Sequence, residues 1–290
     1  MKIDPKPKIL IVTECFSPED FKINDLAFTW AQKGYSIHVL TMIPTYPSGQ
    51  IFSGYRNKLF YKEHINGVTV VRLRGVTGYR ESMLKKLFRF LNFMILASTA
   101  VLFLGRRYDY VFGFNAGALT SMLPAALVSR LYRTPLTLWV QDVWPASVFA
   151  YGIGRGAIAS YSLKRFVRFV YESATCIAIS SKGFERELAS YCREGVRFHY
   201  FPNWAEELEA FTPTDALGDP NLTHFTFAGN IGKQQNLDNV VTAFMRLPCQ
   251  YRQKAQLNLI GDGNRQDSLR LMSEDEPAIR FFGRQKLEAM

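Results

Sequence analysis

An apolar, strand-like run breaks into two glycines and a polar helix start in Phe225-Thr226-Phe227-Ala228-Gly229-Asn230-Ile231-Gly232-Lys233. A backbone that turns sharply and then opens a helix can direct several N–H groups at one anionic group, most simply a phosphate. The stretch lacks the third glycine of a dinucleotide-binding fingerprint and carries Lys233 inside the loop. An ordinary strand-to-helix turn has the same pattern, so the rest of the chain must decide between a phosphate loop and a plain turn.

Short apolar runs alternate with amphipathic stretches along the chain. The predicted strands are Lys8–Thr13, Ser36–Thr41, Val68–Leu73, Tyr110–Phe114, Leu136–Val140, Cys176–Ser180, Arg197–Phe201, Phe225–Ala228, Gln256–Ile260 and Ile279–Phe282. The predicted helices are Asn24–Lys33, Leu84–Leu104, Ala118–Tyr132, Ile158–Tyr171, Lys182–Tyr191, Leu237–Phe244 and Arg265–Met272. Continuous apolar strands separated by helices predict α/β domains with parallel sheets that are covered on both faces.

The series of strands and helices divides the chain into two predicted domains. Residues 1–203 form a complete Rossmann-like domain, residues 204–222 have the acidic, proline-containing composition of a linker, and residues 223–290 begin a second domain. Only three strands precede Met290. We expect such a sheet to leave an apolar edge and an uncovered face, so the chain is expected to be truncated or completed by something else.

The basic character of the chain belongs to its first part. Residues 1–200 carry 26 Lys and Arg against 13 Asp and Glu, whereas residues 201–290 carry 9 against 12. Such an excess suits nucleic acid, an anionic membrane or an anionic substrate, but no nucleic-acid-binding module is present in the sequence, so nucleic acid is not expected as a partner. The four cysteines and four histidines have no metal-ligand spacing, so no metal is expected.

One stretch combines cations with a long apolar run. Lys85, Lys86 and Arg89 precede the mostly apolar residues 91–104. The run Phe90–Gly105 is shorter than the roughly 20 residues that a membrane span needs, so we do not expect it to cross a bilayer. We expect residues 91–104 to be buried, and we expect the cations that precede them to be solvated and able to bind anionic headgroups.

Polar residues follow the predicted strands, where ligands bind in open parallel sheets. They lie in Glu14–Asn24, Pro44–Tyr55, Gln141–Pro145, Ser180–Gly183, Phe201–Trp204, Gly229–Lys233 and Gly261–Asn264. This ordered set resembles the bacterial glycosyltransferases of family 4, in particular the branch that includes N-acetyl-L-fucosamine transferases of surface-polysaccharide synthesis. The most specific parts are Ser17-Pro18-Glu19, Ile23-Asn24-Asp25-Leu26, Pro44-Thr45-Tyr46-Pro47-Ser48-Gly49, Trp139-Val140-Gln141-Asp142-Val143-Trp144-Pro145, Phe201-Pro202-Asn203-Trp204-Ala205-Glu206 and Phe227-Ala228-Gly229-Asn230-Ile231-Gly232.

The resemblance implies a GT-B fold, in which one Rossmann-like domain takes the acceptor and the other a nucleotide-sugar. It implies sugar transfer with retention of configuration, without a metal or other cofactor, and with charge on the leaving diphosphate neutralised by loop N–H groups and cations. The implied donor-binding residues are Gly229, Asn230, Gly232 and Lys233. Relatives carry an arginine after the first glycine and a lysine further on, where this chain has Asn230 and Gln235.

The implied residues of the first domain are a catalytic one and an acceptor-binding set. Asp142 matches the strand-end His or Asp of relatives, although an Asp at this place can also cap a turn or helix. Ser17, Glu19, Asn24 and Tyr46 are the expected acceptor-binding residues, and Ser17-Pro18-Glu19 would serve equally well as a helix entry.

The resemblance further implies a lipid-linked glycan acceptor, and therefore a cytoplasmic protein that binds the inner face of the membrane peripherally. The alternative is an inactive, truncated remnant that binds an acceptor or a membrane. A GT-B epimerase would need more acid and base carboxylates. A nicotinamide-dependent oxidoreductase is disfavoured because Glu14-Cys15-Phe16-Ser17-Pro18, after the first strand, contains no glycine.

Overall fold

The structure is a computed structural model that describes residues 6–79, 82–104, 107–150, 156–205, 219 and 221–285. The chain divides into two compact units, Met1–Ala205 and Glu206–Met290. Most of the predicted linker 204–222, and the end of the chain after Gln285, lie outside the described residues.

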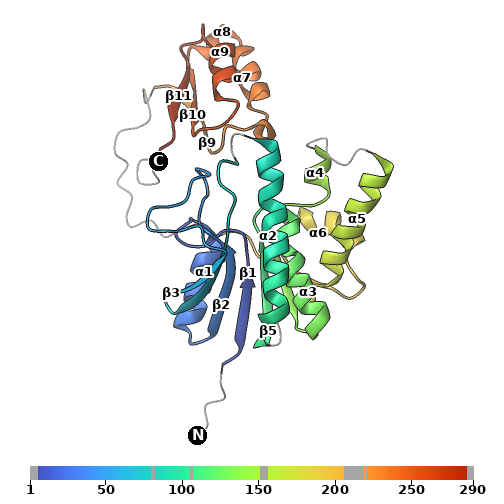
Figure 1. Ribbon diagram of the computed structural model, residues 1–290. Helices are drawn as coiled ribbons and strands as arrows, with labels where there is room; N and C mark the ends of the chain where they lie inside the picture. The colour runs from blue at the N-terminus through green and yellow to red at the C-terminus, as the bar shows by residue number, and fades with distance from the viewer. Residues whose placement is uncertain are drawn as a thin grey trace. The chain divides into compact units, whose positions relative to one another are not determined.

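The first unit contains an eight-stranded sheet (Figure 1). Its strands are β1 (Lys8–Val12), β2 (Ser36–Met42), β3 (Phe60–Ile65), β4 (Val68–Leu73), β5 (Tyr110–Asn115), β6 (Leu136–Val140), β7 (Cys176–Ile179) and β8 (Arg197–Tyr200). Its helices are α1 (Lys22–Gln32), α2 (Met83–Leu104), α3 (Leu123–Tyr132), α4 (Ala146–Ala150), α5 (Ala157–Glu172) and α6 (Gly183–Leu188), with short 3₁₀ turns η2 (Leu119–Met122) and η3 (Ala189–Tyr191).

The strand order is β3-β4-β2-β1-β5-β6-β7-β8, and every neighbouring pair is parallel except β3 and β4. β4 and β6 have the predicted bounds. β3 was not predicted, because Phe60–Ile65 has the polar residues Lys62, Glu63 and His64 at its centre and lies at the sheet edge with every second residue exposed. The search for continuous apolar runs therefore missed a polar edge strand.

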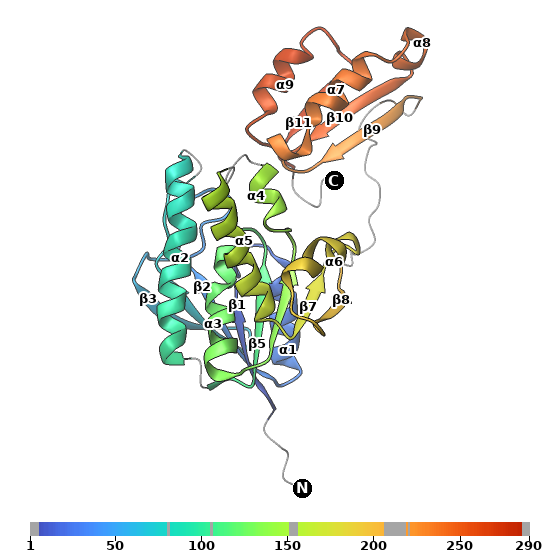
Figure 2. The same cartoon turned by 90° about the vertical axis from the view of Figure 1, so that its right-hand side faces the viewer.

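Two apolar layers cover the faces of this sheet. Residues of α2, α3, α5 and α6 form the core on one face, and Figure 2 shows α2, α3 and α5 along it. Ile23 and Ala27 of α1 cover the other face, where they form a core with Trp139 of β6. The indole of Trp139 stacks on Trp204 with ring centroids 5.7 Å apart, so the end of this unit completes its own core.

Helix α2 differs from the prediction. Phe93, Ala97 and Val101 are buried, but the side chains of its outer face are exposed, with Ile95 at 58% and Phe103 at 80%. The predicted burial of 91–104 is therefore wrong for half of the helix. Leu84–Leu104 is long and apolar enough to cross a membrane by length and composition, although one face packs on the sheet. Arg89, which was expected in solvent, is buried.

The second unit has a three-stranded parallel sheet in the order β11-β10-β9. Its elements are β9 (Thr223–Ala228), η4 (Lys233–Gln235), α7 (Leu237–Met245), α8 (Cys249–Arg252), β10 (Ala255–Ile260), α9 (Gln266–Met272) and β11 (Ile279–Gly283). Apolar residues of α7 and α9 pack on one face.

The other face of this small sheet carries polar side chains. Asn258 donates from Nδ2 to the Nδ1 of His224 at 3.2 Å and to the Oγ1 of Thr226 at 3.3 Å, and its Oδ1 accepts from Gln256 at 2.6 Å. This face is therefore polar, because β-strand alternation places these residues together.

Candidate active site

The sheet of the first unit has a topological switch point between β1 and β5. From β1 the chain proceeds to β2 on one side, and β5 to β8 follow on the other. Ligands of open parallel sheets bind outside the carboxyl ends of the strands at such a point. Glu14 follows β1, Asn115 ends β5 and Asp142 follows β6, so all three lie at this edge.

The carboxylate of Glu19 fixes two loops at this edge. It accepts hydrogen bonds from the backbone N–H of Phe16 at 3.2 Å, of Thr45 at 2.8 Å and of Tyr46 at 2.6 Å. Burial raises the pKa of Glu19, and these hydrogen bonds oppose the shift. Because Glu19 is only 2% exposed, its carboxylate is committed to joining the loop after β1 to the loop after β2.

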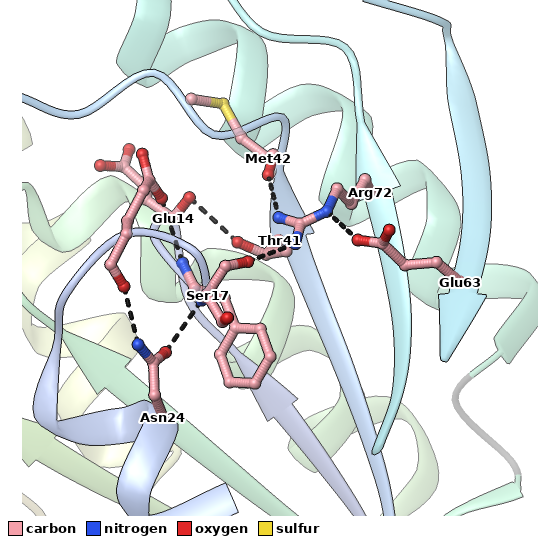
Figure 3. A network of polar contacts seen from close by, with 9 residues as sticks. Glu14, Ser17, Asn24, Thr41, Met42, Glu63 and Arg72 are labelled. Carbon is pink, nitrogen blue, oxygen red and sulfur yellow. Dashed lines mark hydrogen bonds and ion pairs between the residues drawn. The ribbon is translucent and has the colours of Figure 1, made fainter. Parts of the chain in front are cut away.

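Ser17 and Asn24 take part in the same loop network (Figure 3). The side chain of Asn24 accepts from the backbone N–H of Ser17 at 2.9 Å and donates to the carbonyl of Glu19 at 2.7 Å. The structure thus brings Ser17, Glu19 and Asn24 together and gives them a structural role at the entry of α1. The neighbouring Tyr46 has a ring that is 45% exposed. Acceptor binding by these four residues stays a prediction.

Arg72 of β4 is a fully buried cation that the sequence reasoning missed. Its guanidinium donates to the carbonyls of Ser17 and Met42 and pairs with Glu63 of β3, as Figure 3 shows. One side chain thereby joins the loop after β1 to β2 and to the edge strand. A charge in an otherwise mostly apolar strand was the available sequence signal, and Glu63 lies diagonally across from it, since Tyr61 is the residue directly opposite Arg72.

A second buried cation lies close to Glu14. Arg89 of α2 places its guanidinium 4.4 Å from the ring centroid of Tyr79 and its Nη2 3.6 Å from the Sγ of Cys15. Burial raises the pKa of Glu14 to about 7, although the charge of Arg89 lowers it and that of Glu19 adds to the rise. A carboxyl group that titrates near neutral pH at a strand end is typical of functional sites.

Asp142 lies in the loop between β6 and α4. Burial raises the pKa of its carboxyl group, as a proton-accepting or hydroxyl-orienting role requires. The preceding Gln141 accepts through Oε1 from Asn203 at 2.8 Å, which connects this loop to the end of β8. The catalytic role of Asp142 stays a prediction.

In the second unit, two glycine loops pack backbone against backbone. A Cβ on Gly261 would lie 1.8 Å from the carbonyl oxygen of Gly229, and one on Gly263 would lie 2.2 Å from that of Ile231. Gly229 and Gly261 also have φ of +158° and +133°. Only glycine allows this approach, so the predicted donor-binding residues Gly229, Asn230, Gly232 and Lys233 form one compact loop.

Most N–H groups of this loop already have partners. The N–H of Gly229 donates to Ile260 at 2.9 Å, that of Ile231 to Asp262 at 2.9 Å and that of Gly232 to Asn230 at 2.9 Å. These donors are not directed at a ligand as the sequence suggested. Lys233 is exposed and, within the described residues, has no ion pair.

A surface depression among the described residues lies away from the carboxyl edge of the large sheet. It has a volume of about 500 Å³ and lies at the opposite edge, where Pro135 and Thr175 precede β6 and β7. Arg130 in its wall donates to the Oγ of Ser173 at 2.7 Å and pairs with Glu172 at 3.5 Å, so it serves the packing of α3 and α5. No group of three or more His, Cys, Asp or Glu in the described part of the chain is placed to hold a metal ion.

Comparison with known families gives a match over the first unit. The model of the glycosyl transferase 4-like domain matches residues 22–204, which include α1, the sheet from β2 to β8 and the loop of Asp142. The chain belongs to this family.

Two curated relatives agree with this assignment. WbjE of Pseudomonas aeruginosa, described as a glycosyltransferase, is 28% identical over 190 residues, which cover 62% of this chain and 46% of that protein. WcaI of Escherichia coli, described as a glycosyl transferase of colanic acid biosynthesis, is 24% identical over 98% of this chain and 73% of its own length. The chain thus spans less than half of the first relative.

Solved structures confirm the predicted α/β, GT-B-like fold with Rossmann-like domains. WaaG, a glycosyltransferase of lipopolysaccharide biosynthesis, aligns with a TM-score of 0.60 over 96% of this chain and 70% of its own, at 13% identity. The lipopolysaccharide outer core galactosyltransferase WaaB aligns with a TM-score of 0.58 over 96% and 68%, at 12% identity. At these identities the likeness concerns the fold alone.

Proposed function

We propose that the protein is a retaining glycosyltransferase that transfers a sugar from a nucleotide-diphosphate sugar to a lipid-linked glycan during assembly of a bacterial surface polysaccharide. The observation that carries the proposal is the family match over a unit whose sheet ends in Glu14, Asn115 and Asp142 at one edge. The description of WcaI supports this product class. No observation favours the alternative of an inactive remnant.

The proposed chemistry uses charged side chains of the protein and no metal. Departure of the nucleoside diphosphate leaves negative charge that must be stabilised. Lys233, which is exposed and has no ion pair among the described residues, supplies the cation of the glycine loop. Asp142 orients the acceptor hydroxyl or the donor sugar.

Calorimetric titration of the protein with UDP and GDP tests the donor site. We expect Lys233→Gln to weaken nucleotide binding about tenfold, because a charge-assisted contact to phosphate is lost. Lys254→Gln, an exposed lysine of the same unit, is the matched control and leaves binding unchanged. Equal weakening by both variants, or no binding of either nucleotide, contradicts the proposed donor site.

Transfer itself is measured by extension of lipid extracted from bacterial membranes, with a panel of UDP and GDP sugars. We expect Asp142→Asn to lower the transfer rate about a hundredfold without changing the fold, because a group at the reacting centre is lost. The one-bond C–H coupling of the product's anomeric carbon reports the configuration. An anomer opposite to that of the donor contradicts retention.

We also propose that α2 binds an anionic membrane surface, which places the protein at the cytoplasmic face of the membrane. Its outer face exposes large apolar side chains, namely Leu84, Leu87, Phe88, Leu91, Ile95, Leu102 and Phe103. Thr99, also on this face, donates its hydroxyl to the carbonyl of Ile95 at 2.9 Å. Lys85 and Lys86 lie at one end and Arg107 just beyond the other, with no acidic residue between them.

This charge pattern favours lipid over a second copy of the chain. Pairing of two α2 helices would bring cations together in either direction, with Lys85 and Lys86 facing themselves or facing Arg107. Anionic headgroups would instead complement both ends, while the apolar side chains enter the acyl boundary.

Vesicle co-sedimentation tests the membrane proposal. We expect binding to phosphatidylglycerol-containing vesicles and a loss of about thirtyfold in affinity for the double variant Lys85→Gln, Lys86→Gln, because each cation contributes about 1 kcal/mol. Lys254→Gln is again the control. Equal binding to neutral and anionic vesicles contradicts the proposal.

A further inference from the structure

Buried polar atoms without a hydrogen-bond partner gather at the carboxyl edge of the large sheet. Among the described residues they include the Oε1 of Glu14, both amide atoms of Asn115, and the hydroxyls of Thr45 and Thr120. These atoms follow β1, β2 and β5. Buried polar atoms are almost always paired in folded proteins, so a concentration of unpaired ones at a switch point indicates a place for a ligand.

Glu14 and Asn115 are neighbours by the register of their strands. β1 and β5 are parallel, with Ile9 beside Tyr110 and Val12 beside Gly113. β1 ends at Val12 and Glu14 lies in the bend that follows, and the same offset continued by two residues indicates that Glu14 lies near Asn115. Side chains alternate along a strand, and Val12 belongs to the core layer of α2, so Glu14 points to that layer as well.

Glu14 is placed to meet a ligand. Its Oε1 is buried while the residue as a whole stays partly accessible, and its backbone carbonyl accepts from the hydroxyl of Thr41 at 3.0 Å. Met42 donates its N–H to the same carbonyl at 3.3 Å. The backbone is thus fixed, and one carboxyl oxygen reaches inward while the side chain remains open to the edge.

The groups at this place suit a hydroxyl better than an anion. Arg89, the buried cation beside Glu14, contacts the ring of Tyr79 and the Sγ of Cys15, and its Nε is a further buried atom without a hydrogen-bond partner. A carboxyl group accepts a hydrogen bond from a sugar hydroxyl, and a carboxamide both donates and accepts. A phosphate would meet the charges of Glu14 and Glu19 as well as that of Arg89, whereas a neutral hydroxyl meets no such repulsion.

We propose that Glu14 and Asn115 bind a hydroxyl group of the acceptor's sugar at the switch point between β1 and β5. This assignment rests on the proposed function, because it names the sugar-binding groups of that same reaction. In this assignment Glu14 and Asn115 contact the acceptor in place of Ser17, Glu19 and Asn24, because the polar groups of those three residues hold the loops.

Nuclear magnetic resonance of the whole chain tests the assignment. The protein is labelled on its glutamate carboxyl carbons, its asparagine side-chain amides and its glycine backbone amides. Methyl α-D-glucopyranoside and methyl 2-acetamido-2-deoxy-α-D-glucopyranoside are the sugar probes, and inorganic phosphate and UDP are the anionic ones. We expect the sugars to shift the Glu14 and Asn115 signals and phosphate to leave them in place.

Variants make the result specific. Glu14→Gln should weaken sugar binding about tenfold, because a hydrogen bond to a charged or strongly polar acceptor is replaced by a weaker one. Asp20→Asn, an exposed carboxyl in the same loop, should change it by less than about twofold. The glycine signals and the unshifted asparagine signals show in every sample that the fold is intact.

The outcomes separate the two proposals. Sugar-induced shifts at Glu14 and Asn115 that Glu14→Gln weakens support the assignment. Shifts caused by phosphate alone overturn it, because the site then binds an anion. Shifts of Gly229 and Gly232 by UDP, with no sugar effect at Glu14, overturn it and leave the proposed function standing. No response to sugar or UDP overturns both.

Discussion

The two units hold their loops at the carboxyl ends of parallel strands in different ways. In the first unit, buried charged and polar side chains do so: Glu19 bonds three backbone N–H groups, and Arg72 bonds two carbonyls and Glu63. In the second unit, Gly261 and Gly263 let two backbone loops touch directly.

This difference concerns both chemistry and stability. A side-chain network can offer polar atoms such as Glu14 to a ligand, at the cost of buried charge. In the glycine loops, most N–H groups are used within the loops. We therefore expect the first unit to contact the acceptor with side chains, and the second to contact the donor's diphosphate through the exposed side chain of Lys233 and not through the paired backbone donors.

The largest effect is expected for Gly261→Ala. Its Cβ would lie 1.8 Å from a backbone oxygen at a positive φ, so the loops must separate and the second unit should lose about 4 kcal/mol of unfolding free energy. All four tryptophans, at 30, 139, 144 and 204, lie in the first unit. Urea unfolding followed by circular dichroism should thus show an early transition that tryptophan fluorescence does not.

Gly283→Ala is the matched control for the comparison. Gly283 also has a positive φ of +67°, but a Cβ there meets nothing within 4 Å. We expect a loss of only about 1 kcal/mol, the cost of the left-handed conformation alone. Equal losses in the two variants would break the claim that backbone contact, rather than conformation, holds the glycine loops.

The glycine loops were also the more predictable of the two regions. The pattern of an apolar run followed by Gly229 and Gly232 marks a turn by local chemistry, which sequence shows directly. The parallel strands were predictable for the same reason, since Val68–Leu73 and Leu136–Val140 are continuous apolar runs. Local signals carry this much of the fold.

The polar network of the first unit could not be predicted in the same way. Arg72 contacts Ser17 across 55 residues of sequence, and Arg89 reaches Cys15 across 74. From helical periodicity alone, an arginine in a helix is predicted to lie on the solvated face, because the sequence does not reveal the buried partner for its charge. Pairing depends on strand order, and strand order comes from the tertiary structure.

Glu19→Ala tests the side-chain half of the comparison. Loss of the carboxylate leaves the N–H groups of Phe16, Thr45 and Tyr46 without an acceptor, so we expect a loss of about 3 kcal/mol. Here tryptophan fluorescence should follow the early transition. Asp20→Ala, one residue along and exposed, should change stability by less than about 0.5 kcal/mol. An equal loss of stability in both variants would show that the loop tolerates no side-chain truncation. The three hydrogen bonds of Glu19 would then not be the cause of the loss.

The smallest expected effect is a gain, and it depends on pH. The pKa of Glu14 is about 7 in the folded protein against 4.5 for an ordinary glutamate, so the folded state holds the proton more tightly. Its contribution to stability is therefore present below about pH 4.5 and is lost as the pH rises to about 7 and above. Glu14→Gln mimics the protonated form at every pH.

We expect Glu14→Gln to match the parent protein near pH 4.5 and to be more stable by about 2 kcal/mol at pH 8, a figure reduced because the side chain is partly accessible. Urea unfolding at the two pH values, followed by tryptophan fluorescence, measures the difference, and Asp20→Asn is the matched control. A gain that is equal at both pH values would mean that Glu14 ionises like an exposed carboxyl. The loops of the first unit would then be held by the geometry of their side-chain contacts, as those of the second unit are by glycine contacts. No group that titrates near neutral pH would take part.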